Sequence, residues 1–485
     1  MPGMGTPELP VPDGLVLRPF RGVRFTVEDP AKVTSPPYDL ISDADVERLL
    51  DSHPNNVVRL ILPRSPRRNA PTSSSTAADA PPQDRYAEAR DTLRTWLSSG
   101  VLAPDAEPAL YVYEQKGPGV VQRGLIGDVG LADPTQAIVL PHEDVLPGPI
   151  ADRLALMSTT QANLEPIFLL YDGGDGATTR LVDAVADERS PLVSARTEDG
   201  LTHRLWAITD PSEIAAINAD LHHRQALIAD GHHRYATYRV LQRQEHLSRR
   251  PNAEAQAEAA QTEAAHDEAA LGAAGSGAGS AAGQRSSGDG GRSRPAFGPW
   301  DFGLALLVDS SAYPPDLKAI HRVIPSLPLE DAVAKAKGAW RVHDHPEIAE
   351  GVAALERTQG PAFLLAGEGG AHLLTDPDPM QLARAMPADH SDRWNSLNTS
   401  ILTSFVLPIV WGLRDDEQTV RIVHHDIDAA VRLARQMGGT AVILKPLAVE
   451  DVLAVAAGGE RVPRKSTSFG PKPRTGLVLR TFDID

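Results

Sequence analysis

The stretch ALIADGHHRYATYRVL, residues 226–241, decides the fold class of this chain. Residues 226–229 are an apolar run, which is typical of a buried strand. Asp230 and Gly231 form a turn, and a helix is expected to begin near His232. A strand that passes through a glycine turn into a helix is a unit of mixed α and β proteins.

The same patterns recur along the chain and predict an α+β protein. Short apolar runs predict strands at residues 57–62, 109–113, 120–131, 167–171, 204–208 and 226–229, and later at 302–308, 362–366, 419–423 and 441–444. Helical periodicity predicts helices at 43–50, 86–97, 211–221, 329–338, 396–410, 426–436 and 448–456. Both halves of the chain are therefore expected to be mixed α/β regions.

Two stretches offer almost nothing to bury. Residues 65–83 consist largely of Ser, Thr, Ala and Pro, and residues 249–297 are rich in Ala, Gly, Glu, Gln and Ser. Such compositions do not offset the entropy lost on ordering. We expect a flexible insertion at 65–83 and a disordered linker at 249–297, which separates an N-terminal region (1–248) from a C-terminal region (298–485).

Composition excludes several classes of function. The 485 residues hold 47 Lys plus Arg against 64 Asp plus Glu, a net charge of −17. So acidic a chain is a poor general binder of nucleic acid or anionic membrane. The absence of cysteine excludes disulfides, thiolate zinc sites and a cysteine nucleophile. No apolar run approaches the roughly 20 residues of a membrane span, so we expect a cytoplasmic protein.

The turn at Asp230 predicts a phosphate site. A helix start presents free backbone N–H groups and the positive end of the helix dipole. Arg234 adds a planar cation that suits phosphate oxygens, and His232 and His233 add imidazoles that donate to an oxyanion or move protons. No GxxxxGK[ST] loop occurs. The alternative is that Asp230 only caps the helix and the histidines are polar surface residues.

A second group of polar residues follows an extended segment, in VLPHED at residues 139–144. His142 and Glu143 are candidates for a general base, a metal ligand or a substrate clamp, and Arg153 follows shortly after them. The alternative is a solvated acidic loop. No HExxH or other fixed spacing predicts a bound metal.

A third group lies in VTSPPYD, residues 33–39, where two prolines fix the backbone. They hold Ser35, Tyr38 and Asp39 in a rigid, non-helical presentation, which makes these three side chains candidates for substrate binding. The alternative is that the Pro-Pro turn is only architectural.

The segment RVPRKSTSFGPKPRTG, residues 461–476, gathers five cations near the end of an acidic chain. Lys465 and the hydroxyls of Ser466 and Thr467 are donors that suit an anionic ligand. We expect this segment to close over such a ligand. The alternative is a solubilising tail, because runs of charge usually face water.

These motifs together resemble the bacterial and archaeal family catalogued as domain of unknown function 1015. The landmarks run collinearly through PFRGVR (19–24), SPPYD (35–39), LYVY (110–113), HE (142–143), PIFLLY (166–171), DGHHR (230–234), AIHRV (319–323), LKP (444–446), PRKST (463–467) and GLV (476–478). Two departures stand out: the chain has DVLPGP at 144–149 where the family has a Thr and further charges, and KSTSFGPK at 465–472 where the family has KSTYFYPK. The second departure removes or displaces two aromatic rings.

The DGHHRYA turn is also similar to the phosphate-gripping turn of ParB and sulfiredoxin-like domains. That superfamily includes nucleotide-binding partition proteins, a sulfinic-acid reductase and free-serine kinases. The resemblance implies a ParB/sulfiredoxin-like fold around the turn and a nucleotide as ligand. If the protein transfers phosphate from that nucleotide, Mg²⁺ is expected to bridge phosphate oxygens and carboxylates.

The leading hypothesis is an enzyme that transfers phosphate to or from a small hydroxylated metabolite, in the manner of a free-serine kinase. Phosphate would lie at Gly231, His232, His233 and Arg234, and Lys465 would close the site. Glu143 or Asp230 would take the proton of the attacking hydroxyl, with His142 beside them. The alternatives are a phosphomonoester hydrolase and a nucleotide-responsive regulatory or scaffold protein. A single site of this kind requires the four motifs SPPYD, HE, DGHHR and PRKST to share one cleft.

Overall fold

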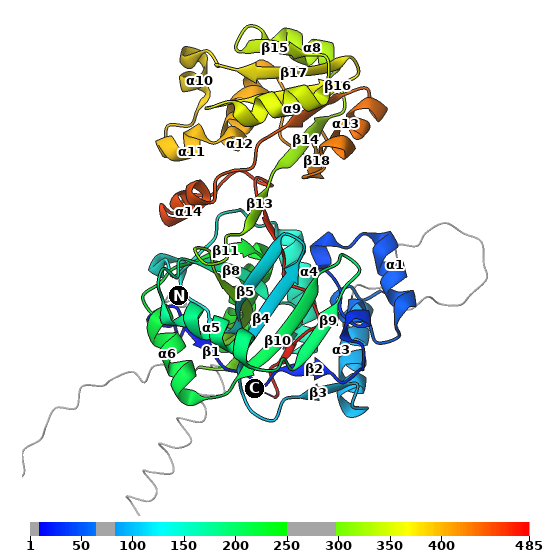
Figure 1. The fold of residues 1–485 in the computed structure, drawn as a ribbon, viewed down its shortest axis with the longest axis vertical. Coiled ribbons are helices and arrows are strands. Elements are labelled where there is room, and N and C mark those ends of the chain that lie inside the picture. Colours follow the sequence, from blue (N-terminus) through cyan, green and yellow to red (C-terminus); the bar gives the residue numbers. More distant parts are fainter. Residues whose placement is uncertain (1–8, 65–82, 250–296, 417, 485) are drawn as a thin grey trace, which may run out of the picture.

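The computed structural model describes residues 9–64, 83–249, 297–416 and 418–484. The predicted insertion and linker therefore lie outside the described residues, apart from residues 83, 249 and 297. The chain is a mixed α and β protein, as predicted, and Figure 1 shows two bodies, one above the other, that are joined near β13 (Asp316–Lys318).

The lower body is built on a nine-stranded mixed sheet. Its strand order is β6-β11-β8-β12-β5-β4-β10-β9, and β1 pairs with the C-terminal end of β5. The pairs β6–β11 and β8–β12 are parallel, and the others are antiparallel. The strands are β1 (Leu17–Arg18), β4 (Leu110–Gly117), β5 (Val120–Gly130), β6 (Val139–Leu140), β8 (Ile167–Tyr171), β9 (Val193–Arg196), β10 (Thr202–Ile208), β11 (Ala226–Asp230) and β12 (Phe302–Asp309).

This sheet does not follow the division of the chain at 249–297. Strand β12 comes after that stretch, yet it lies between β8 and β5 in the centre of the lower sheet. Its residues are buried from Gly303 to Asp309. An apolar run that is buried on both faces belongs in the middle of a sheet, so residues from both predicted regions build the lower body.

Helices cover the lower sheet because their apolar faces complete its two cores. On one face, α5 (Ala177–Glu188), α6 (Pro211–Leu221) and the helix over residues 232–249 pack against the sheet. At one end lies a helical group of α1 (Asp43–Ser52), α2 (Val58–Ile61), α3 (Gln83–Ser98) and α4 (Pro147–Thr160) beside the ribbon β2 (Val23–Phe25) and β3 (Leu102–Pro104). None of the helices in the described ranges is long and apolar enough to cross a lipid bilayer.

The predicted strand at 57–62 is wrong, because residues Val58–Ile61 form the helix α2. Periodicity cannot separate a buried helix turn from a strand in so short an apolar run. The side chain of Asn56 decides the local structure. Its Oδ1 accepts the N–H of Val58 at 3.0 Å, and its Nδ2 donates to the carbonyls of Lys32 and Thr34 at 2.9 and 3.2 Å.

The upper body is a six-stranded antiparallel sheet with helices on both faces. Its strand order is β15-β17-β16-β19-β14-β18. The elements are β14 (Ile320–Ile324), α8 (Leu329–Ala336), β15 (Arg341–His345), α9 (Ile348–Arg357), β16 (Phe363–Gly367), β17 (Gly370–Thr375), α10 (Pro379–Ala385), α11 (Asp392–Ser396), α12 (Asn398–Ile401), the wide-turn helix η5 (Leu402–Val410), β18 (Arg421–His424), α13 (Ile427–Gln436) and β19 (Thr440–Ile443). Helices α9 and α13 pack on one face, and α8, α12 and η5 on the other.

The chain returns from the upper body to the lower one. Helix α14 (Val449–Ala457) contributes to the core of the lower sheet, β20 (Ser468–Gly470) pairs with β13, and β21 (Arg480–Thr481) pairs with β7 (Ala162–Asn163). The PRKST segment therefore lies where the chain passes between the two bodies (Figure 1).

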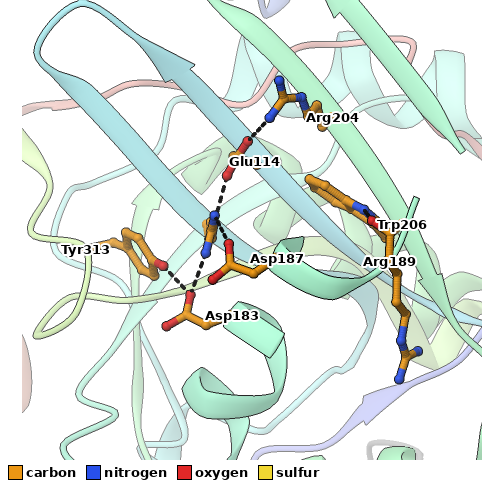
Figure 2. Close-up of polar contacts among 8 residues, drawn as sticks. Glu114, Asp183, Asp187, Arg189, Arg204, Trp206 and Tyr313 are labelled. Atoms are coloured by element: carbon orange, nitrogen blue, oxygen red, sulfur yellow. Dashed lines mark hydrogen bonds and ion pairs between the residues drawn. The ribbon is translucent and has the colours of Figure 1, made fainter. Parts of the chain in front are cut away.

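A cluster of ion pairs holds the outgoing connection from the lower to the upper body, between β12 and β13. Arg123 of β5 contacts Glu114 at 2.7 Å, Asp183 at 3.1 Å and Asp187 at 2.7 Å, and so joins the sheet to α5. The Tyr313 hydroxyl, which lies shortly before β13, donates to the same Asp183 (Figure 2). A partly buried network of this kind fixes geometry more effectively than an isolated surface pair.

Candidate functional site

The four motifs meet at one cavity. It has a volume of about 390 Å³ and is lined by residues of the N-terminal SPPYD segment, the HE loop, the DGHHR turn and the PRKST segment. Strand β18 of the upper body adds His424 to the wall. The prediction of a shared cleft is confirmed. Of the predicted site residues, those that line the cavity are Tyr38, Asp39, Glu143, Asp230, Gly231, His232, His233, Arg234, Lys465 and Thr467.

The turn after β11 requires glycine. Gly231 has a φ of +94°, a conformation that residues with a Cβ rarely adopt. A Cβ at this position would lie 2.9 Å from Cγ2 of Ile167 and 3.2 Å from two guanidinium nitrogens of Arg234. The backbone can therefore enter the helix over 232–249 at once, with its first turn at the cavity.

That first turn leaves three N–H groups free. The first helical hydrogen bond runs from the N–H of Tyr235 to the carbonyl of Gly231, at 2.9 Å. Within the described ranges, the N–H groups of His232, His233 and Arg234 have no acceptor. Free N–H groups and the positive end of the dipole make such a turn attractive to an anion.

The two histidines hold the neighbouring loop in place. Nε2 of His232 accepts the backbone N–H of His142 at 3.2 Å, and Nε2 of His233 accepts that of Leu146 at 3.0 Å. Burial lowers the pKa of both imidazoles, so they are neutral near pH 7. Their Nε2 atoms are therefore acceptors here, and their main effect is to position the HE loop.

Thr467 links His142 to Glu143. Its hydroxyl lies 2.8 Å from Nε2 of His142 and 2.9 Å from Oε1 of Glu143. Burial lowers the pKa of His142 to about 3, and burial raises the pKa of Glu143 against the opposing effects of Thr467 and Lys465. A carboxyl group whose pKa is raised toward the working pH can act as a general base or a general acid.

Arg234 is a structural link as well as a lining residue. Its guanidinium donates to Oδ2 of Asp230 at 2.6 Å and to the carbonyl of Pro166 at 2.5 Å, and only 4% of the residue is exposed. The buried Nε has no hydrogen-bond partner among the described residues. Two of its five N–H groups therefore have acceptors within the described residues.

Lys472 is the cation that sequence reasoning did not single out. Its Nζ lies 2.6 Å from Oδ2 of Asp39 and 2.6 Å from Oδ1 of Asp230. Burial alone would lower the pKa of Lys472, but the two carboxylates raise it. Burial alone would raise the pKa of Asp39, but Lys472 lowers it. The flanking Pro471 and Pro473 were the signal in the sequence, because a lysine between two prolines has a fixed backbone.

Four predicted site residues do not line the cavity: Ser35, His142, Arg153 and Ser466. Ser35 exchanges backbone hydrogen bonds with Thr475, and its hydroxyl donates to the carbonyl of Pro36. Arg153 pairs with Asp152, donates to the carbonyl of Ile61 and lies 4.5 Å over the Tyr38 ring. The Ser466 hydroxyl donates to the carbonyl of Pro463. These polar groups are used to hold the backbone and Tyr38.

The residues present do not form a Mg²⁺ site by themselves. Among the described residues, no group of three or more His, Asp or Glu side chains is arranged to hold a metal ion. The carboxylates of Asp39 and Asp230 approach each other, but the ammonium of Lys472 lies between them. Asp39 and Asp230 are therefore engaged with Lys472 and are not free to hold a metal ion.

Comparison of the sequence with known protein families places the chain in one of them. The sequence model described as "Protein of unknown function (DUF1015)" matches residues 17–269, more than half of the chain. The chain belongs to this family. No curated protein matches the DUF1015 chain.

Solved structures show only a distant similarity to this DUF1015 protein. A free serine kinase in complex with AMP has a TM-score of 0.33 and 12% identity, over 75% of this chain and 93% of that chain. SbnI with a C-terminal truncation, from Staphylococcus aureus, has a TM-score of 0.33 and 10% identity, over 73% and 87%. A conserved hypothetical protein from Pyrococcus furiosus has a TM-score of 0.32 and 12% identity, over 75% and 97%. At these TM-scores the similarity assigns neither a fold nor a ligand to the DUF1015 chain.

Proposed function

We propose that this protein is an enzyme that transfers a phosphoryl group between a small phosphate-bearing molecule and a hydroxyl group. The observation that carries the proposal is the first turn of the helix over 232–249. Its three free N–H groups belong to residues that line the same cavity as the cation of Lys465 and the carboxylate of Glu143. An anion-binding turn, a cation and a base at one cavity are the parts that phosphoryl transfer needs.

The charges in the cavity indicate where the phosphate would bind. Arg234 and Lys472 are cations, but Asp39 and Asp230 compensate their charge. Lys465 is exposed and forms no ion pair with any described residue. The free N–H groups and Lys465 are therefore the groups most available to a phosphate.

Glu143 is the better candidate for the base. Both oxygens of Asp230 are bonded to cations, through Arg234 and Lys472, which disfavours the uptake of a proton. Glu143 accepts the neutral hydroxyl of Thr467 and is bonded to no cation among the described residues, and burial raises its pKa. In the proposed step the hydroxyl oxygen of the acceptor forms the new P–O bond and the P–O bond to the leaving oxygen breaks. The hydroxyl proton passes to Glu143.

Hydrolysis is the second candidate, because water in place of the acceptor hydroxyl would use the same base and the same phosphate contacts. A nucleotide-responsive protein without turnover stays the third. Whether Mg²⁺ enters with a nucleotide, and whether the turn is ParB/sulfiredoxin-like, also stay predictions.

Phosphorus NMR of the full chain tests the proposal and separates the candidates. ATP, ADP, CTP or pyrophosphate is offered with serine as acceptor, with and without Mg²⁺, and phosphoserine is offered alone. We expect a new phosphomonoester signal from the wild type and its loss in Glu143→Gln, with the exposed Glu356→Gln as the matched control. Release of inorganic phosphate from phosphoserine alone indicates the hydrolase. Equal turnover in Glu143→Gln and the wild type contradicts the assignment of the base.

A further inference from the structure

Arg322 is a buried cation whose hydrogen bonds to the described residues all go to backbone carbonyls. It lies on β14 of the upper body and is 3% exposed. Its guanidinium donates to the carbonyls of Lys465 at 2.8 Å, Arg464 at 3.2 Å and Ile320 at 3.1 Å. It forms no ion pair with any carboxylate of the described residues. Burial lowers its pKa to about 10, so it is charged at neutral pH.

Packing alone does not explain an arginine at this position. A buried charge without an ionic partner costs stability, and an apolar side chain of similar size would fill the space without that cost. The guanidinium offers something that an apolar side chain lacks, which is a rigid fork of donors. Here one nitrogen of that fork, Nη2, donates to two successive carbonyls, those of Arg464 and Lys465, while Nη1 donates to the carbonyl of Ile320 on the same strand.

Lys465 has a strained backbone. Its φ is +57°, in the left-handed region that costs free energy for a residue with a Cβ. Such a conformation persists only where the surroundings over-determine it. The surroundings here are the Arg322 fork on its carbonyl, the Ser466 hydroxyl on the carbonyl of Pro463, and the bond from Thr467 to Glu143.

We propose that Arg322 is a positioning residue of the cleft, which binds the carbonyls of Arg464 and Lys465 and thereby holds Lys465 at the cavity as a phosphate-binding cation. The inference rests on the proposed function and adds a role for the upper body. Through β14, that body sets the conformation of the loop that supplies the cation, although Arg322 itself does not line the cavity.

A double-mutant cycle separates positioning from a merely structural role. Calorimetric titration with pyrophosphate is carried out on the full-length wild type, Arg322→Met, Lys465→Ala and the double variant. A charge-assisted contact corresponds to roughly tenfold or more in affinity, so we expect Lys465→Ala to weaken binding about tenfold and Arg322→Met by several-fold. If Arg322 acts through Lys465, the double variant binds as Lys465→Ala does, within about twofold.

Two further variants keep the test decisive. Arg341→Met, at an exposed position of β15 in the same sheet, is the matched control and should bind as the wild type does. If Arg322→Met does not fold, Arg322→Lys takes its place in the cycle, since a lysine keeps the charge but lacks the planar guanidinium that reaches the loop carbonyls and the carbonyl of Ile320 at once.

Multiplicative losses in the double variant overturn the inference and leave the proposed function standing. Full affinity in Lys465→Ala overturns the inference and also the assignment of Lys465 as a phosphate-binding cation, but not the role of the helix turn. A wild type that binds neither pyrophosphate nor a nucleotide overturns both.

Discussion

Replacing Gly231 by alanine tests the turn on which the proposed site depends. The substitution adds one methyl group at a backbone position with a φ of +94°. The new Cβ would lie 2.9 Å from Cγ2 of Ile167, which is fully buried, and 3.2 Å from Nε and Nη2 of Arg234. The backbone, Ile167 or the guanidinium must therefore move.

The expected cost has two parts. The left-handed backbone costs roughly 1–2 kcal/mol for a residue with a Cβ, and a methyl group forced against a packed core costs about 1–3 kcal/mol. The reduced freedom of the unfolded chain returns about 0.4–1 kcal/mol. We expect Gly231→Ala to lose about 2–4 kcal/mol of unfolding free energy, and its affinity for pyrophosphate to fall because the first helical turn and Arg234 shift together.

Gly100→Ala is the matched control. Gly100 also has a positive φ, of +76°, but nothing lies within 4 Å of an added Cβ. The control should lose only about 1 kcal/mol and keep wild-type affinity. Urea unfolding of both variants measures the difference. Equal losses in the two variants, or full ligand affinity in Gly231→Ala, would refute the reasoning about this turn.

Three further predictions concern the charges of the cleft. Arg234→Met should lose about 3 kcal/mol of unfolding free energy, because Asp230 and the carbonyl of Pro166 lose their shared donor; a loss of ligand binding at unchanged stability would contradict this. Glu143→Gln should abolish turnover but keep pyrophosphate affinity. Because burial raises the pKa of Glu143, the wild type should lose unfolding free energy relative to Glu143→Gln as the pH rises from the ordinary Glu pKa of about 4.3 through the raised value. Lys472→Met should make the unfolding free energy fall less steeply as the pH is lowered into the acid range. Lys472 lowers the pKa of Asp39, so this stabilisation is complete above the ordinary pKa of about 3.9 and lost as the pH falls through the lowered value; an unchanged slope in the acid range would argue against the pair.

The sequence predicted local elements where one periodicity dominated. The strand–turn–helix at β11 was predicted correctly, because an apolar run, a glycine and a polar helix start agree with one another. The short run at 57–62 failed, because the bonds of Asn56 to Lys32 and Thr34 come from a distant part of the chain. The position of β12 within the lower sheet is likewise a long-range pairing that no local pattern contains.

The sequence identified most of the residues that line the candidate site, but not the contacts that they make with one another. Glu143, Asp230 and Lys465 line the cavity, as their chemistry suggested. Nε2 of His232 and of His233 accepts a backbone N–H from the loop at 142–146, a contact that the sequence did not predict, and the phosphate-binding role of both residues stays a prediction. Which partner a polar side chain finds depends on the elements folded against it, and a single sequence does not contain that information.

Hydrogen–deuterium exchange at the first turn of the helix over 232–249 tests the central claim most directly. We propose that the free N–H groups of His232, His233 and Arg234 bind the phosphate. Peptides that cover this turn are followed in the full chain with and without saturating pyrophosphate. We expect markedly slower exchange at these amides when pyrophosphate is bound. Bound pyrophosphate with unchanged exchange at this turn would contradict it.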